Sequence, residues 1–190
     1  MRPFEFIILF FSFIYTLALT HLLFAWTRMI RYRRKLILSW PHLLWMVVAF
    51  FNLSVDWISL WDFRSDASLS LGTIVVGFTL VVISYFTCAL VSPDFEAGET
   101  FDMNAFHEAE GRTYIGAMLV MFLAALLVNL LAGAALGIGK WSSENNVVAI
   151  QLLGLPLVLI KRQWAQVLAP LIILACTIVY GVIYYPMLAG

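Results

Sequence analysis

Six long apolar segments, separated by short polar connections, limit what this chain of 190 residues can fold into. A helix needs about 20 mostly apolar residues to cross the hydrocarbon core of a bilayer, because each residue advances the helix by about 1.5 Å. The six segments are residues 4–27, 39–61, 70–92, 113–138, 145–160 and 165–188. The sequence therefore predicts an all-α fold, one domain over residues 1–190 that forms an integral membrane bundle of six transmembrane helices.

The amino-acid composition favours a membrane protein over a soluble one. The chain is 63% hydrophobic and 12% charged, whereas a soluble domain usually carries about 25% charged residues. The sequence contains no Gly-rich phosphate loop, no paired-cysteine metal motif and no Ser, His and Asp in an order that fits a hydrolase. We therefore assign no catalytic residue and do not expect an enzyme, although the sequence leaves that question open.

Positive charge is concentrated in the connection after the first apolar segment. Five cations lie within eight positions, namely Arg28, Arg31, Arg33, Arg34 and Lys35. Because Lys and Arg are retained on the cytoplasmic side of a membrane, we expect this connection inside and, with six spans, both termini outside. The same five side chains are candidates for contact with anionic lipid headgroups. Membrane topology accounts for the cluster, so we expect no nucleic-acid partner.

The longest connection, residues 93–112, is acidic. It reads PDFEAGETFDMNAFHEAEGR and holds six carboxylates. The predicted topology places it on the same face as the basic connection, so the two could pair. His107, Glu108 and Glu110 are also suitable ligand types for a cation, but their spacing matches no specific metal motif. The sequence leaves open whether this connection is a solvated loop, a gate or a divalent-cation site.

Polar residues recur on one face of the second, third and sixth segments. Asn52 and Asp56 are spaced i and i+4, and at about 100° per residue His42 lies in the same arc. Ionisable groups inside a span usually face the protein interior. One hypothesis is an oligomeric channel or transporter for an ion, a proton or a small polar solute; the alternative is helix packing. The candidate pathway residues are His42, Asn52, Asp56, Thr73, Ser84, Thr87, Thr177, Tyr180 and Tyr184.

The fourth segment carries small or polar residues at strict four-residue spacing, namely Ala125, Asn129, Gly133 and Gly137. Small residues at this spacing let two helices approach closely, and an amide can hydrogen bond across the contact. The face is a candidate for packing against another helix of the chain, a second copy or a larger membrane complex. An alternative function is therefore a non-catalytic accessory subunit.

Two histidines raise a third possibility. His21 and His42 lie near the basic connection, on adjacent segments. Opposed histidines on neighbouring helices can hold a b-type haem. We predict no cofactor, and keep a haem-binding redox protein as an alternative.

Three stretches carry a resemblance to known proteins: LALTHLLFAWTRMIRYRR, HLLWMVVAFFNLSVDWISLWDFR and YFTCALVSPDFEAGETFDMNAFHEAEGRTYIGAML. Together they resemble a family of small bacterial polytopic integral membrane proteins of unassigned function. The resemblance covers residues 15–120 and rests on a basic end to the first span, a Trp-rich second span and a Pro–acid loop before an arginine. It implies a location in the bacterial inner membrane, so that the outer termini are periplasmic. It transfers no activity and no site.

Overall fold

The computed structural model describes residues 3–60, 71–96, 100–135, 143–154, 156 and 162–184. Within these ranges, the side chains at positions 3, 4, 73, 128–135, 143–147, 163 and 184 are outside the description. The helices are α1 (Pro3–Arg31), α2 (Trp40–Ser59), α3 (Leu71–Val91), α4 (Met103–Ala135), α5 (Ser143–Gly154) and α6 (Gln163–Tyr184). A 3₁₀ turn η1 (Arg33–Lys35) and two short strands, β1 (Leu36–Ile37) and β2 (Phe101–Asp102), lie between them.

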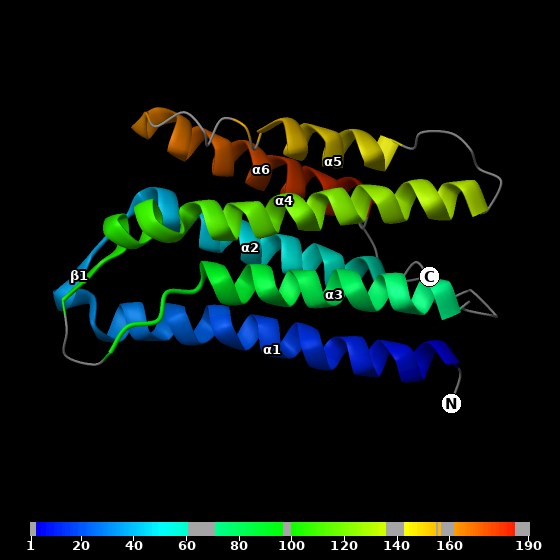
Figure 1. Ribbon diagram of the computed structural model, residues 1–190, viewed down its shortest axis with the longest axis horizontal. Coiled ribbons are helices and arrows are strands. Elements are labelled where there is room, and N and C mark those ends of the chain that lie inside the picture. The colour runs from blue at the N-terminus through cyan, green and yellow to red at the C-terminus, as the bar shows by residue number, and fades with distance from the viewer. Residues whose placement is uncertain are drawn as a thin grey trace.

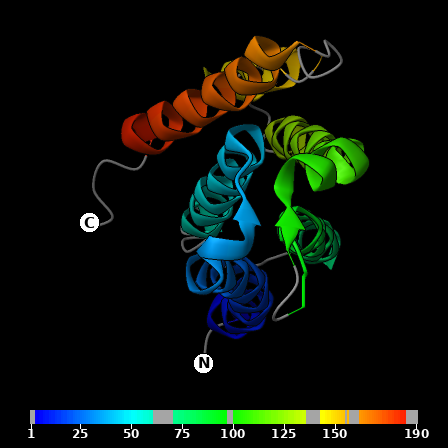
Figure 2. The same cartoon turned by 90° about the vertical axis from the view of Figure 1, so that its left-hand side faces the viewer.

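The helices run along the long axis of the molecule and form a bundle around α2 (Figures 1 and 2). α2 packs against α1, α3, α4 and α6, while α5 packs against α4 and α6. α1 begins at the right-hand end of Figure 1 and leads to η1 and β1 at the left-hand end, where β2 and the start of α4 also lie. We call this left-hand end the loop end. The bundle confirms the predicted helical fold.

Within the described ranges, five helices are long and apolar enough to cross a membrane, namely α1, α2, α3, α4 and α6. α5 has 12 residues and spans about 18 Å, which is shorter than the hydrocarbon core of about 30 Å. It ends at Gly154, two residues before Pro156, where a proline cannot continue the helix. The predicted count of six spans is therefore not confirmed, and residues 155 and 157–160 of the fifth segment lie outside the described part.

α1 shows why these segments form a bundle rather than single spans. Its buried residues alternate at spacings of four and three, which places them in one stripe along the helix: Phe11, Tyr15, Ala18, Leu22, Ala25 and Met29. The other faces expose large apolar side chains, including Phe6 and Phe13, at 66% and 74%. A soluble protein would leave this surface in water, whereas a bilayer covers it.

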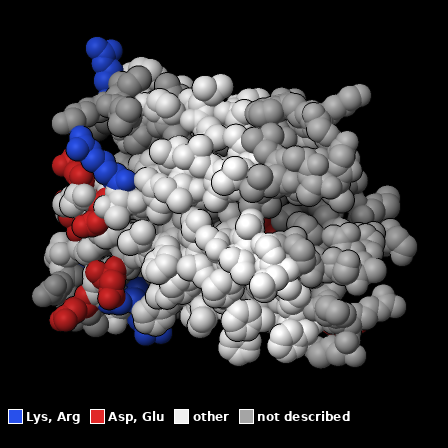
Figure 3. Space-filling model, turned by 45° about the vertical axis from the view of Figure 1, so that its right-hand side comes forward, with Lys and Arg blue, Asp and Glu red and all other residues white. Residues whose placement is uncertain are grey.

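The basic and acidic connections meet at the loop end. β1 pairs with β2 in parallel, with Leu36 opposite Phe101 and Ile37 opposite Asp102. Asp102 then caps α4, because its Oδ1 accepts hydrogen bonds from the backbone N–H of Asn104 at 2.8 Å and of Ala105 at 3.3 Å. Figure 3 shows most of the visible charged side chains of the described residues gathered at this end. The possible pairing of the two connections is thus observed.

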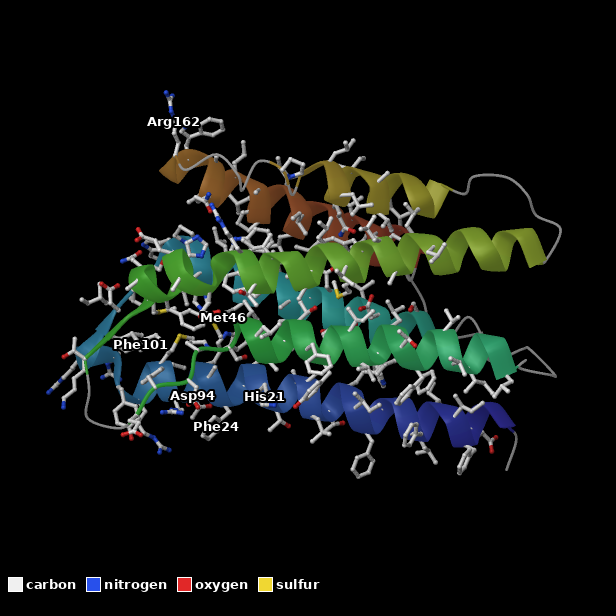
Figure 4. The ribbon with its side chains drawn as sticks, viewed as in Figure 1. His21, Phe24, Met46, Asp94, Phe101 and Arg162 are labelled. Carbon is white, nitrogen blue, oxygen red and sulfur yellow. The ribbon has the colours of Figure 1, made fainter. Side chains whose placement is uncertain are left out.

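One ion pair ties these connections together. Arg28 at the end of α1 binds the carboxylate of Asp94. The Arg28 guanidinium carbon also lies 4.7 Å from the centre of the Phe95 ring and 5.5 Å from that of Phe24. Asp94, Phe24 and Phe101 lie close together in Figure 4. The cation–π contacts hold Arg28 against the protein, so Arg28 is less available to lipid than an unrestrained arginine would be.

Candidate functional site

A carboxylate inside the bundle is held by a hydroxyl from the next helix. The Ser84 Oγ of α3 donates a hydrogen bond to Asp56 Oδ2 of α2 at 3.1 Å. Ser84 is buried and Asp56 is half-buried. Both residues are on the predicted pathway, and the structure brings them together.

One turn before Asp56, Asn52 joins a second polar contact that spans three helices. Gln151 of α5 donates from Nε2 to the Thr177 Oγ1 of α6 at 2.8 Å. The Thr177 hydroxyl lies 3.3 Å from Asn52 Oδ1 and 2.9 Å from its own-helix Ile173 carbonyl, and its one hydrogen can be donated to either oxygen. Asn52 in turn donates from Nδ2 to the Val48 carbonyl at 2.9 Å. We call Asn52, Asp56, Ser84, Gln151 and Thr177 the mid-bundle cluster.

Gln151 is a member of this cluster that sequence reasoning missed. It is 5% exposed, like Asn52, and Thr177 is 2% exposed. The signal was present in the sequence, because Gln151 is the only polar side chain between Asn146 and Lys161. It was overlooked because the fifth segment is short and contains a proline.

Besides His42, the structure describes the side chains of two further pathway candidates, Thr87 and Tyr180. Thr87 is buried, and its hydroxyl donates to the Ile83 carbonyl of its own helix at 3.0 Å. Tyr180 is half-buried on α6. The side chains of Thr73 and Tyr184 lie outside the described residues.

His42 lies at the loop end, ten residues before Asn52 and therefore about 15 Å away along α2. Trp45, Met46 and Val48 are fully buried between the two positions, and Figure 4 shows Met46 inside the bundle. The predicted arc on α2 is therefore divided into two polar regions by an apolar stretch. The predicted arc used only the angle of each residue around the helix axis. It did not take into account how far apart the residues lie along that axis.

His42 belongs to a second polar group formed with α4 and α6. His42 Nδ1 lies 3.4 Å from the Tyr114 hydroxyl, and His107 Nδ1 hydrogen bonds to the same hydroxyl from the other side of the contact. His107 Nε2 lies 3.3 Å from Gln166 Oε1. His42 and Tyr114 are both 0% exposed, whereas His107 is half-buried. We call His42, His107, Tyr114 and Gln166 the loop-end cluster.

Aromatic rings enclose the loop-end cluster. The ring centres of Phe106 and His42 are 5.1 Å apart, those of Phe101 and Phe106 are 5.9 Å apart, and those of Phe95 and Phe101 are 4.8 Å apart. Sequence reasoning grouped His107 with the loop carboxylates and missed Tyr114. The spacing of seven residues between His107 and Tyr114 on one helix was the available signal, because i and i+7 lie on the same face.

The two histidines considered for haem have different partners. His21 is exposed, and its Nε2 lies 3.2 Å from the Tyr85 hydroxyl of α3. His42 faces Tyr114 of α4. Among the described residues, no group of three or more His, Cys, Asp or Glu is placed to hold a metal ion. The haem hypothesis therefore gains no geometric support, and it stays a prediction.

The packing and lipid candidates are described only in part. Ala125 is half-buried on α4. The surroundings of Asn129 and Gly133, and the whole of Gly137, lie outside the described residues. Of the basic cluster, Arg31, Arg33, Arg34 and Lys35 are exposed at the loop end.

Comparison of the chain with protein-family models, with curated proteins and with solved structures finds no match.

Proposed function

We propose that this protein moves an ion, a proton or a small polar solute across the bacterial inner membrane, with Asp56 as the charged element of the route. The observation that carries the proposal is the Asp56–Ser84 hydrogen bond, which holds a carboxylate inside an apolar bundle. Carboxylates inside membrane spans are energetically costly and typically serve ion or proton pathways. We place the route beside α2, α3 and α6, and we propose that the protein works as a homo-oligomer.

Helix direction supports six crossings for this route. α4 and α6 both start at the loop end and run toward the opposite end (Figure 1). The chain between them must therefore return along the bundle, and α5 is part of that return. In the proposed topology this return is the fifth span, the basic connection is cytoplasmic and both termini are periplasmic.

The mid-bundle cluster supplies the polar groups that such a route needs beside its charge. Gln151, Thr177 and Asn52 are linked across three helices, and Asn52 lies about one turn from Asp56 on α2. Their amide and hydroxyl groups can exchange partners with a passing solute, because each group both donates and accepts hydrogen bonds. The route therefore has neutral polar contacts on α5 and α6 and a carboxylate between α2 and α3.

The test is flux in liposomes that contain the purified protein, with proton, potassium and sodium gradients and a small neutral polar solute measured separately. Asp56→Asn keeps the size of the side chain and removes its charge, and we expect it to reduce the transported flux at least tenfold. Ser84→Ala should reduce it less, because the carboxylate stays.

Glu96→Gln is the matched control, because Glu96 is an exposed carboxylate at the loop end and its loss should leave flux unchanged. If the parent protein transports none of these species, or if Asp56→Asn transports like the parent, the proposed function is wrong. Equal losses in Asp56→Asn and Glu96→Gln would assign the effect to total charge rather than to the bundle interior.

A further inference from the structure

We propose that His42, His107 and Tyr114 form a binding site for one first-row transition-metal ion of the class that imidazole prefers, such as Zn²⁺, Co²⁺ or Cu²⁺. Three donor atoms from two helices converge: the Nδ1 atoms of both histidines and the hydroxyl oxygen of the tyrosine. Imidazole nitrogen with an oxygen ligand is a common donor set for these ions. The site is independent of the route assigned to Asp56.

One separation of the donor atoms fits a tetrahedral ion, and the other requires the Tyr114 hydroxyl to move away from His107. At metal–ligand distances of about 2.0–2.1 Å, two ligands of a tetrahedral ion lie about 3.3 Å apart. His42 Nδ1 and Tyr114 Oη are separated by 3.4 Å. The centres of the His42 and His107 rings are 6.4 Å apart. The Tyr114 hydroxyl is in hydrogen-bond contact with His107 Nδ1, so an ion can bind all three donor atoms only if this hydroxyl moves away from His107.

Gln166 prepares His107 to be a ligand. Its Oε1 is an acceptor at 3.3 Å from His107 Nε2, so that nitrogen carries the hydrogen and Nδ1 keeps its lone pair. A histidine that binds a metal through one nitrogen usually donates the hydrogen of the other to such an oxygen. The lone pair of Nδ1 is therefore directed to the place where the three donor atoms meet.

Gly111 leaves room for a fourth ligand. A Cβ at this position would lie 3.6 Å from His107 Nδ1 and 3.7 Å from the Tyr114 hydroxyl. These separations are close to the spacing of ligands around one ion, so a small external ligand fits where alanine would place its methyl group. Glycine is unfavourable inside a helix such as α4. The space that it leaves for a fourth ligand would explain a glycine at this position.

The hydrogen bonds of the loop-end cluster satisfy only one nitrogen of the buried His42 ring. His42 is 0% exposed, and its Nε2 has no hydrogen-bond partner among the described residues. Trp45 Nε1 in α2 and Ser39 Oγ, at the residue before α2, are also buried without partners there. An ion bound at Nδ1 would leave His42 Nε2 unsatisfied as well, so the free energy of metal binding would have to exceed the cost of burying this nitrogen.

The alternative is a chain of hydrogen bonds and no metal. In that arrangement His42 donates from Nδ1 to the tyrosine oxygen, and the tyrosine hydroxyl donates to His107 Nδ1. Metal binding and this chain exclude each other at the same atoms, because the ion takes the lone pairs that the hydrogens would occupy. A metal titration separates the two arrangements.

The experiment is a titration of the purified full-length protein, made without a polyhistidine tag, with Co²⁺ alone and then with Zn²⁺ as competitor. We expect one Co²⁺ per chain, with the intense visible bands of tetrahedral cobalt, and loss of those bands when Zn²⁺ is added. Tyr114→Phe removes only the ligand oxygen, and we expect it to weaken binding at least tenfold. Gln166→Leu, which leaves all three ligands in place, should weaken binding about 10–100-fold.

The control is His21→Asn, because the chain has three histidines and His21 is not in the cluster. It should bind Co²⁺ like the parent. Circular dichroism and size-exclusion chromatography check that each variant is folded, and His107→Gln is a second ligand variant at a half-buried position. If the parent binds no Co²⁺ with tetrahedral bands, or if Tyr114→Phe and His107→Gln bind like the parent, the site is a hydrogen-bond chain and the proposal is wrong. Because this readout needs no transport, its result does not depend on the flux assay.

Discussion

The mid-bundle cluster and the loop-end cluster both include residues of α2, but their buried polar groups find hydrogen-bond partners to different extents. In the mid-bundle cluster, small hydroxyl and amide side chains from α5 and α6 meet Asn52. In the loop-end cluster, large rings surround His42, and its Nε2 remains without a partner among the described residues. A cluster that satisfies itself can serve packing or a polar route, whereas a buried nitrogen left without a partner among the described residues costs free energy.

Truncating a buried side chain in the apolar stretch between the two clusters should lower the free energy of unfolding more than a change in either cluster. Met46 is 0% exposed, and Met46→Ala should lower the free energy of unfolding by about 2–5 kcal/mol, because the bundle cannot fully close the cavity. Denaturant unfolding in detergent, followed by tryptophan fluorescence, measures this. Leu153→Ala is the control, because Leu153 is 75% exposed and should change little. Equal losses would mean that the two regions are not separated by a packed core.

Tyr114→Phe should have the next largest effect on stability. The change leaves the Nδ1 atoms of His42 and His107 without their shared partner, which should lower the free energy of unfolding by about 1–3 kcal/mol in metal-free protein. Tyr85→Phe is the matched control, because its hydroxyl contacts the exposed ring of His21. The same unfolding assay compares the two variants. If Tyr85→Phe lowered the free energy of unfolding as much as Tyr114→Phe, burial of the loop-end cluster would not make its hydrogen bonds more stabilising.

The hydrogen bond between Gln151 and Thr177 in the mid-bundle cluster should contribute less to the free energy of unfolding. In a double-mutant cycle with Gln151→Leu and Thr177→Val, we expect a coupling of about 0.6 kcal/mol, the usual size for a hydrogen bond between membrane helices. Unfolding of the two single variants and the double variant gives the coupling. A value near zero would mean that the two side chains are only neighbours, and it would remove α5 from the proposed route.

The Arg28–Asp94 ion pair should contribute least to the free energy of unfolding. Asp94 is 93% exposed in its side chain, so water screens the charge, and Asp94→Ala should cost about 0.2–0.5 kcal/mol. Arg28→Ala should cost more, because it also removes the contacts with Phe24 and Phe95. The ratio of the two losses in one unfolding assay tests this. If Asp94→Ala were the more damaging change, charge rather than ring contact would anchor the end of α1.

Much of the architecture could be predicted because a bilayer imposes simple rules on sequence. The length of an apolar segment predicts a helix that is long enough to span the bilayer, and α1, α2, α3, α4 and α6 are long and apolar enough to do so. The fifth segment is different, because the helix described within it, α5, has 12 residues and ends at Gly154. Mean hydropathy is averaged over a whole segment, so it does not show where a helix within that segment ends.

The candidate site was predictable only where both partners lie inside obvious spans. Asp56 with Ser84, and Asn52 with Thr177, are polar residues on apolar helices, and such residues turn toward one another. Tyr114 was missed because tyrosine is common at membrane interfaces and does not stand out there. The pairing of β1 with β2 could not be predicted, because a strand of two residues has no periodicity to detect.

The parallel pair of β1 and β2 has a consequence for how the loop-end cluster is aligned. β1 ends three residues before α2 begins, and β2 leads directly into α4, so the pair sets how far these two helices are offset along their length. A slip of one residue in this pair would shift one helix against the other by about 3.3 Å. That shift is as large as the separation of His42 Nδ1 from the Tyr114 hydroxyl, and it would carry the two side chains out of reach. Two short strands outside the bundle thus act as a spacer that fixes the register of the histidines and the tyrosine within it.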